Sequence, residues 1–261
     1  MKVEKMVLLF DIGNTNIVLG ICKEGKIIQT FRYVTNALLT EDDYYQKINI
    51  SIASISQVEA IEGCIIASVV PQLDSVFLQM MERYYHIKPL FVGSGLKSGL
   101  QIKLEHPKQL GADLLCDCVG AYHKYGGPSI VVDMGTATKL LVVTENKVFL
   151  GGAICAGIKG AMDSLVNTTS KLSRTALEVP SKVVNNETST SIQSGIVYGH
   201  IAMIDGLVEK IKEELQIHHA HVILTGGYAR IIKDVLKTKV IYDETVLLDG
   251  LYAIYQKNTN R

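Results

Sequence analysis

The sequence of 261 residues has no surplus of charge, no long apolar run and no disulfide pattern. Lysine plus arginine and aspartate plus glutamate both number 26, whereas nucleic-acid or membrane-surface binders usually have a basic excess. The apolar stretch Met6 to Phe10 ends at Asp11 and is far shorter than the ~20 residues of a membrane span, or than the apolar part of a signal peptide. We therefore expect a cytoplasmic protein that binds neither nucleic acid nor membrane.

The cysteines give no sign of a disulfide framework or a metal site. They number five, an odd count, and are scattered through apolar surroundings, which favours reduced, buried thiols. Cys116 and Cys118 would face different ways on a helix, so they are not expected to bind a metal together. His218, His219 and His221 have no acidic or thiol partner at a ligand spacing, and a solvated helix end is the favoured interpretation.

What the sequence does contain is material for a core and an internal repeat. Hydrophobic residues make up 48% and charged residues 20%, a composition typical of a soluble globular protein. Two stretches have the same pattern of aspartate, any residue, glycine and then small polar residues, namely Asp11 to Asn16 and Asp133 to Thr138. Each lies between two apolar runs, which predicts a two-stranded hairpin with the aspartate at a strand end.

Such a turn can hold a metal-bound polyphosphate. The glycine lets an anion approach the main chain, the hydroxyl or amide groups bind it, and the carboxylate holds a cation. A single Asp-X-Gly is ordinary turn chemistry, but two copies in matching strand contexts favour phosphate binding. Gly226 and Gly227, between an expected strand and helix, could approach an adenine or ribose, although a plain turn is the commoner reason for that pair.

The order of expected elements also repeats. Three strands (6–10, 17–22 and 26–33) precede alternating helices and strands, and a second set of three (129–132, 139–143 and 147–152) does the same. Thr40 is expected to cap one helix and Pro71 to open another. This order predicts a duplicated mixed-sheet α/β protein, with halves 1–97 and 98–261 and a nucleotide in the cleft between them.

At this point the chain resembles the type III pantothenate kinases, members of the actin, sugar kinase and Hsp70 superfamily with ribonuclease H-like domains. The two aspartate motifs resemble the family's first and second phosphate motifs. The resemblance covers nearly the whole chain. Five further short motifs lie in the order that the family has: Ala67 to Pro71, Gly111 to Asp113, Gly151 to Ile154, Ser191 to Gly195 and Leu224 to Gly227.

The resemblance implies an activity, cofactors and an assembly. The family transfers the γ-phosphoryl group of ATP to the primary hydroxyl of pantothenate, the first step of coenzyme A synthesis. It uses Mg²⁺ and usually a monovalent cation, K⁺ or NH₄⁺. It is homodimeric, with each acceptor site close to the subunit interface.

The resemblance also assigns roles to residues. Asp11 and Asp133 would hold metal, and Asp113 would be the general base. The acceptor would be contacted near Gly111, Leu114, Leu104 and Thr188, the last in the neighbouring subunit's site. The remaining candidates would bind the nucleotide and its phosphates: Gly13, Asn14, Thr15, Gly135, Thr136, Gly226 and Gly227. From the residues alone, Asp113 could equally be an acid that stabilises a helix start.

Several positions depart from the family's pattern. Leu114 replaces an arginine that faces the acceptor, and leucine cannot pair with a carboxylate. Leu104 stands where a tyrosine is common, and Ala156 replaces a proline. Lys139 replaces a threonine after the second phosphate motif. That lysine could serve the phosphates or supply the charge of a monovalent cation, but a solvent-exposed side chain is the favoured interpretation.

Three functional interpretations follow, in order of preference. The first is a pantothenate kinase whose acceptor anchor has moved to Lys103, Lys108 or Arg174. The second is a kinase of a different small alcohol. The third is a nucleotide-binding regulatory protein without turnover.

Overall fold

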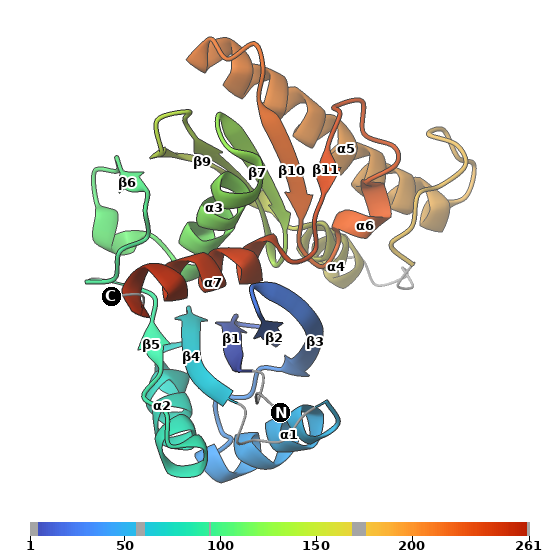
Figure 1. The fold of residues 1–261 in the computed structure, drawn as a ribbon. Coiled ribbons are helices and arrows are strands. Elements are labelled where there is room, and N and C mark those ends of the chain that lie inside the picture. Colours follow the sequence, from blue (N-terminus) through green and yellow to red (C-terminus); the bar gives the residue numbers. More distant parts are fainter. Residues whose placement is uncertain (1–4, 56–60, 94, 169–175, 260–261) are drawn as a thin grey trace. The chain divides into compact units, whose positions relative to one another are not determined.

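The computed structural model of the protein describes residues 5–55, 61–93, 95–168 and 176–259 (Figure 1). The chain forms two compact units. The first comprises Met1–Leu100, Glu105–His123 and Thr245–Arg261, and the second comprises Gln101–Leu104 and Lys124–Glu244. These units divide the chain differently from the predicted halves 1–97 and 98–261, because two helices that follow residue 98 pack against the first sheet.

The first unit contains a five-stranded sheet in the order β3-β2-β1-β4-β5. Strands β1, β2 and β3 are antiparallel neighbours, and β4 and β5 add to β1 in parallel. The strands are β1 (Met6–Ile12), β2 (Asn16–Lys23), β3 (Lys26–Val34), β4 (Ile61–Ser68) and β5 (Leu90–Phe91). Four helices accompany them: α1 (Glu41–Ala53), α2 (Pro71–Tyr85), α3 (Ala112–Tyr125) and α7 (Val246–Thr259).

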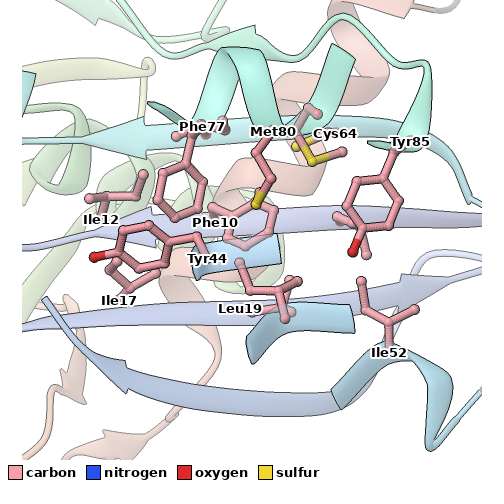
Figure 2. Packing of buried hydrophobic residues seen from close by; sticks show 14 of the residues in the cluster. Phe10, Ile12, Ile17, Leu19, Tyr44, Ile52, Cys64, Phe77, Met80 and Tyr85 are labelled. Carbon is pink, nitrogen blue, oxygen red and sulfur yellow. The ribbon is translucent and has the colours of Figure 1, made fainter. Parts of the chain in front are cut away.

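The helices cover the two faces of this sheet. On one face, α1 and α2 bury an aromatic and aliphatic cluster in which Phe10 and Tyr44 both pack against Phe77 (Figure 2). On the other face, Val7 and Leu9 of β1 pack with buried residues of α3 and α7. Strand β1 therefore has apolar partners on both faces of the sheet, which explains why its sequence is a continuous apolar run.

Local signals fix the helix starts of the first unit. The Thr40 hydroxyl accepts a hydrogen bond from the Asp43 amide, and the Asp43 carboxylate accepts one from the Thr40 amide at 2.9 Å, which together form the capping box of α1. Pro71 is the first residue of α2, where its missing N–H costs nothing. Both expectations for these helix starts are confirmed.

Helices α3 and α7 cross at two glycines. A Cβ added at Gly120 would lie 1.8 Å from the Val246 carbonyl oxygen, and one added at Gly250 would lie 1.9 Å from the Cys116 carbonyl oxygen. Only residues without a side chain let the two backbones approach this closely. The crossing fixes α3, which carries Asp113, against α7.

The second unit repeats the topology of the first. Its sheet has the order β11-β10-β7-β8-β9-β6, in which β7, β8 and β9 form the antiparallel meander and β10 and β11 add to β7 in parallel. Strand β6 is an addition parallel to β9. The strands are β6 (Gln101–Ile102), β7 (Ser129–Met134), β8 (Ala137–Val143), β9 (Val148–Ala156), β10 (His221–Thr225) and β11 (Ile241–Tyr242).

The helices of the second unit pack on one face of its sheet. They are α4 (Ile158–Thr168), α5 (Thr188–Leu215) and α6 (Ala229–Ile232). Val197, Ile204 and Val208 of α5 are buried against Ile130 and Val132 of β7. Both sheets are therefore mixed and share one strand order, as the repeated sequence pattern predicts. In the described part of the chain, no helix combines the length and apolar character that crossing a bilayer requires.

Candidate functional site

The first aspartate motif forms the turn between β1 and β2. Asp11 lies near the end of β1, opposite Val18 of β2. The Gly13 amide donates to the Asn16 carbonyl oxygen at 3.0 Å and thereby closes the turn, and the side chains of Asn14 and Thr15 are exposed. The turn therefore presents polar groups outward while the strand on each side is buried.

Neighbouring segments hold this first turn in place. The Thr35 hydroxyl donates to the Gly13 carbonyl oxygen at 2.6 Å, and the Thr35 amide donates to the Thr15 carbonyl oxygen at 3.1 Å. The Val69 amide, from the motif that follows β4, donates to the Ile12 carbonyl oxygen at 3.0 Å. Residues far apart in sequence thus converge on the end of β1.

The candidate base lies in the same unit as Asp11. Asp113 is in the first turn of α3, and Gly111 precedes it at a point where an added Cβ would lie 2.5 Å from Asp113 Oδ1. A side chain at this position would require the Asp113 carboxylate to move. The Leu115 amide donates to the Gly111 carbonyl oxygen at 3.1 Å, which fixes the start of the helix.

The Cys116 thiol reports on the charges around it. Burial raises its pKa well above the ordinary value, and the negative charges of Asp11, Asp117 and Asp113 raise that pKa further. These three carboxylates, which belong to β1 and α3, therefore lie close enough to one buried sulfur to raise its pKa. The structure brings together the predicted metal ligand Asp11 and the predicted base Asp113.

Asp117 is a residue that the sequence analysis missed. It is 1% exposed and lies one helical turn after Asp113, so the two carboxylates share a face of α3. The signal was present in the sequence as two aspartates four positions apart on an expected helix. Asp117 therefore adds a buried carboxylate to the face of α3 that carries the candidate base.

The second aspartate motif forms the turn between β7 and β8. The Gly135 amide donates to the Ala137 carbonyl oxygen at 3.1 Å, and Thr136 at the tip is exposed. Asp133 pairs in register with Lys139, and Lys139 Nζ donates to Asp133 Oδ2 at 2.9 Å. The side chains of these two residues are only 16% and 14% exposed. The expectation that Lys139 points to solvent was therefore wrong.

Two further glycines pack against this second turn. Gly226 has φ of +94°, and an added Cβ would lie 2.5 Å from both Asp133 Oδ1 and the Met134 amide nitrogen. Gly157 approaches from the end of β9, where an added Cβ would lie 2.2 Å from the Thr136 carbonyl oxygen. Gly227 is exposed beside Gly226. The structure thus brings the nucleotide candidates Gly135, Thr136, Gly226 and Gly227 together with Asp133.

The candidate acceptor residues are divided between the units. Leu114 follows Asp113 on α3 and is half-buried. Leu104 belongs to the second unit and packs beside Gly151, where an added Cβ would lie 3.3 Å from Leu104 Cδ2. Thr188 is the exposed first residue of α5. Of the proposed replacement anchors, Lys103 and Lys108 are exposed, and Arg174 lies outside the described residues.

The motif Ser191 to Gly195 has a structural role on α5. The Gln193 side chain donates to the Ala176 carbonyl oxygen at 2.8 Å, and the Ser194 hydroxyl donates to the Val183 carbonyl oxygen at 2.6 Å. Both side chains are buried. They hold the segment that precedes α5 against that helix.

A magnesium ion at this site would depend on few protein ligands. In the described ranges, no three or more histidine, cysteine, aspartate or glutamate side chains are arranged to hold a metal. Mg²⁺ usually keeps several waters and binds through one or two carboxylates together with substrate phosphates. The carboxylate of Asp11 at a phosphate-type turn fits that mode of binding.

Solved structures of other proteins share this fold. A Campylobacter jejuni protein assigned to the Baf family of transcriptional activators aligns with a TM-score of 0.59 at 18% identity, covering 97% of this chain and 100% of that one. A Sinorhizobium meliloti protein assigned as a 2-dehydro-3-deoxygalactonokinase gives 0.61 at 12% identity, with 98% and 97% covered. The activator of 2-hydroxyisocaproyl-CoA dehydratase from Clostridium difficile, solved with ADPNP, gives 0.51 at 14%, with 97% and 96% covered.

These likenesses define the class of the fold: it is the duplicated α/β fold of actin-like ATPases and sugar kinases, as predicted. The sequence itself narrows the class. The family model for type III pantothenate kinase matches residues 7–210, and the chain belongs to that family. The matched residues include both aspartate turns, Asp113 and Thr188.

Proposed function

We propose that the protein transfers the γ-phosphoryl group of ATP to the primary hydroxyl of pantothenate in the cytoplasm. Membership of the family supports a phosphotransferase. The observation that carries the proposal is the packing of β1, which carries Asp11, with α3, which carries Asp113 in its first turn. It puts a candidate metal ligand and a candidate proton acceptor, from distant parts of the sequence, in one region of one unit.

Each part of the group would have a distinct task in the reaction. The acceptor hydroxyl oxygen forms a bond to the γ-phosphorus, the bond to the β-γ bridging oxygen breaks, and ADP leaves. Asp113 would take the hydroxyl proton late in the transition state. Asp11 would hold Mg²⁺, which when bound neutralises phosphate charge. The backbone amides and hydroxyls of both turns would bind the phosphates.

The proposal has further parts that follow from the family. The nucleotide would be bound by both aspartate turns, with Gly226 and Gly227 beside the nucleoside. A monovalent cation, K⁺ or NH₄⁺, would assist. The active form would be a homodimer in which Thr188 reaches the partner's acceptor. Sedimentation tests this last part, and a monomer would contradict it.

A coupled assay of ADP release tests the activity. With ATP, Mg²⁺ and K⁺ present, we expect ADP release that depends on added pantothenate. Asp113→Asn should lower turnover about a hundredfold or more while ATP binding is kept, since general bases typically contribute 10²- to 10⁴-fold. Near wild-type turnover of this variant would contradict the role of Asp113. Absence of pantothenate-dependent release at millimolar substrate would contradict the proposal itself.

A second candidate is a kinase of a different small alcohol, and Leu114 favours it. A half-buried leucine beside the base cannot bind a carboxylate, so an acceptor without that group would suit the position. A panel of small alcohols in the same assay distinguishes this candidate from pantothenate. Leu114→Arg should lower the KM for pantothenate roughly tenfold if only the anchor has been lost, and no change would count for the second candidate.

ATP binding without ADP release in the presence of any added alcohol would indicate a third function. The protein would then act as a regulatory ATP-binding member of the family. Calorimetric titration with ATP, carried out beside the release assay, separates this outcome from a kinase with an untested acceptor, because the kinase releases ADP once its alcohol is supplied.

A further inference from the structure

Lys139 and Asp133 form a pair built into the second unit. They face each other directly across β7 and β8, so their side chains lie on the same face of the sheet. The ammonium is 2.9 Å from Asp133 Oδ2, and both side chains are largely buried. Lysine and aspartate side chains are usually exposed to solvent, and neither of these two is.

The Asp133 carboxylate is enclosed on two sides. Lys139 Nζ contacts Oδ2, and the Gly226 turn lies so close that a Cβ there would be 2.5 Å from Oδ1. A metal ion bound directly to this carboxylate would have to compete with an ammonium that is tethered in place. The ion would also lie beside the positive charge of the Lys139 ammonium, and two positive charges bound to one carboxylate repel each other.

The location of the ammonium suits a phosphate group. Lys139 stands three residues beyond Thr136 at the tip of the Gly135 turn, within the cluster that also contains Gly226. Lysine binds phosphate as a compact point charge with three N–H donors. An ammonium already fixed by a carboxylate loses less side-chain entropy when the phosphate arrives.

We propose that Lys139 binds the polyphosphate of the nucleotide directly, and that Asp133 positions its ammonium instead of coordinating the metal. This inference rests on the proposed nucleotide site and adds a binding residue that the phosphate motif itself does not contain. The family's aspartate would thereby keep its place in the second turn but have a different task in this chain.

The test is a calorimetric titration of ATP, with EDTA and then with Mg²⁺. The decisive variant is Asp133→Asn with Lys139→Met, because it removes both charges and leaves the net charge of the pair unchanged. We expect its Kd for metal-free ATP to rise about tenfold or more, since a charge-assisted contact is lost. The gain in affinity on adding Mg²⁺ should be at least as large as in the wild type.

Two results would overturn the inference. One is a double variant that binds metal-free ATP within about twofold of the wild type. The other is a double variant whose affinity for ATP no longer rises when Mg²⁺ is added, which would identify Asp133 as a metal ligand. Lys139→Met alone should also weaken ATP binding, and circular dichroism melts of all variants establish that they are folded.

A control variant tests the effect of losing any lysine. Lys210→Met removes an exposed lysine that pairs with Glu213 on α5, and it should leave the Kd for ATP unchanged. If the wild type neither binds ATP nor releases ADP, the proposed function and the inference fail together. If the wild type binds ATP and turns over while the double variant keeps full affinity for metal-free ATP, the inference alone fails.

Discussion

The two aspartate turns have the same pattern in the sequence but different surroundings in the structure. Asp11 faces the alkyl side chain of Val18 across its hairpin, whereas Asp133 faces the ammonium of Lys139 at 2.9 Å. The first turn lies near a group of carboxylates, and the second lies against glycines. The two copies of the motif therefore differ in the residue opposite the aspartate, which is apolar in the first and cationic in the second.

The difference shows how a single cross-strand residue can change the chemistry of a turn whose sequence motif is repeated. Strand pairing puts residue 18 opposite Asp11 and residue 139 opposite Asp133. Lys139 supplies an ammonium to the carboxylate of the second turn, whereas the apolar side chain of Val18 cannot do so for Asp11.

Removing each carboxylate charge compares the copies most directly. Asp11→Asn should lower turnover about a hundredfold or more, because a metal ligand stabilises transition-state charge by several kcal/mol. Asp133→Asn should lower it only about tenfold, because there the loss is the positioning of an ammonium. The ADP-release assay measures both, and equal losses would show that the two turns perform the same task.

The glycine behind the second turn should be the most sensitive to a side chain. Gly226→Ala is expected to destabilise the protein by about 3 kcal/mol, because its φ is +94° and the new Cβ would meet the Met134 backbone. Gly227→Ala is the matched control, since nothing lies within 4 Å of its added Cβ, and it should cost less than about 1 kcal/mol. Urea unfolding measures both, and similar costs would contradict the described packing.

A lysine opposite Asp11 should give the first turn the same cross-strand ion pair as the second turn. Val18→Lys puts an ammonium opposite Asp11, and the Mg²⁺ concentration for half-maximal activity should rise roughly tenfold as the two cations compete. Val18→Met provides a long side chain without charge and should leave that concentration nearly unchanged. An unaltered Mg²⁺ requirement in Val18→Lys would separate metal binding from the cross-strand neighbour.

The smallest expected difference concerns the turn glycines themselves. A Cβ at Gly13 would lie 3.1 Å from the Asn16 carbonyl oxygen, whereas one at Gly135 would lie 3.6 Å from Asp133 Oδ1. Gly13→Ala should therefore cost about 0.5 to 1 kcal/mol in unfolding free energy, and Gly135→Ala less than about 0.5 kcal/mol. Thermal unfolding compares the two, and a larger cost at Gly135 would reverse the ranking.

Much of the fold could be predicted because the sequence signals were local. The strands of the first hairpin, the Thr40 cap and the Pro71 helix start all follow from neighbouring residues. The helix after Gly227 was predicted to extend to about Lys237 but ends at Ile232. The Asp205 carboxylate of α5 accepts hydrogen bonds from the Lys237 and Thr238 amides, and this distant partner turns the chain.

The sequence motifs of the site could be predicted, but the side-chain contacts between residues of the site could not. The ion pair of Lys139 with Asp133 depends on the strand register, and the second turn is one residue shorter between paired strand residues than the first. Neither the register nor the burial of Asp117 can be deduced from spacing alone. The grouping of α3 and α7 with the first sheet likewise depends on which apolar faces meet.

The glycine crossing of α3 and α7 has a consequence for synthesis on the ribosome. Helix α7 follows the whole second unit in the chain, yet it packs against the helix that carries Asp113 and against β1 and β4. A nascent chain that has completed β1 to α3 still lacks one layer of its first core. The earliest-made half of the site therefore acquires its final support only after translation has passed residue 259.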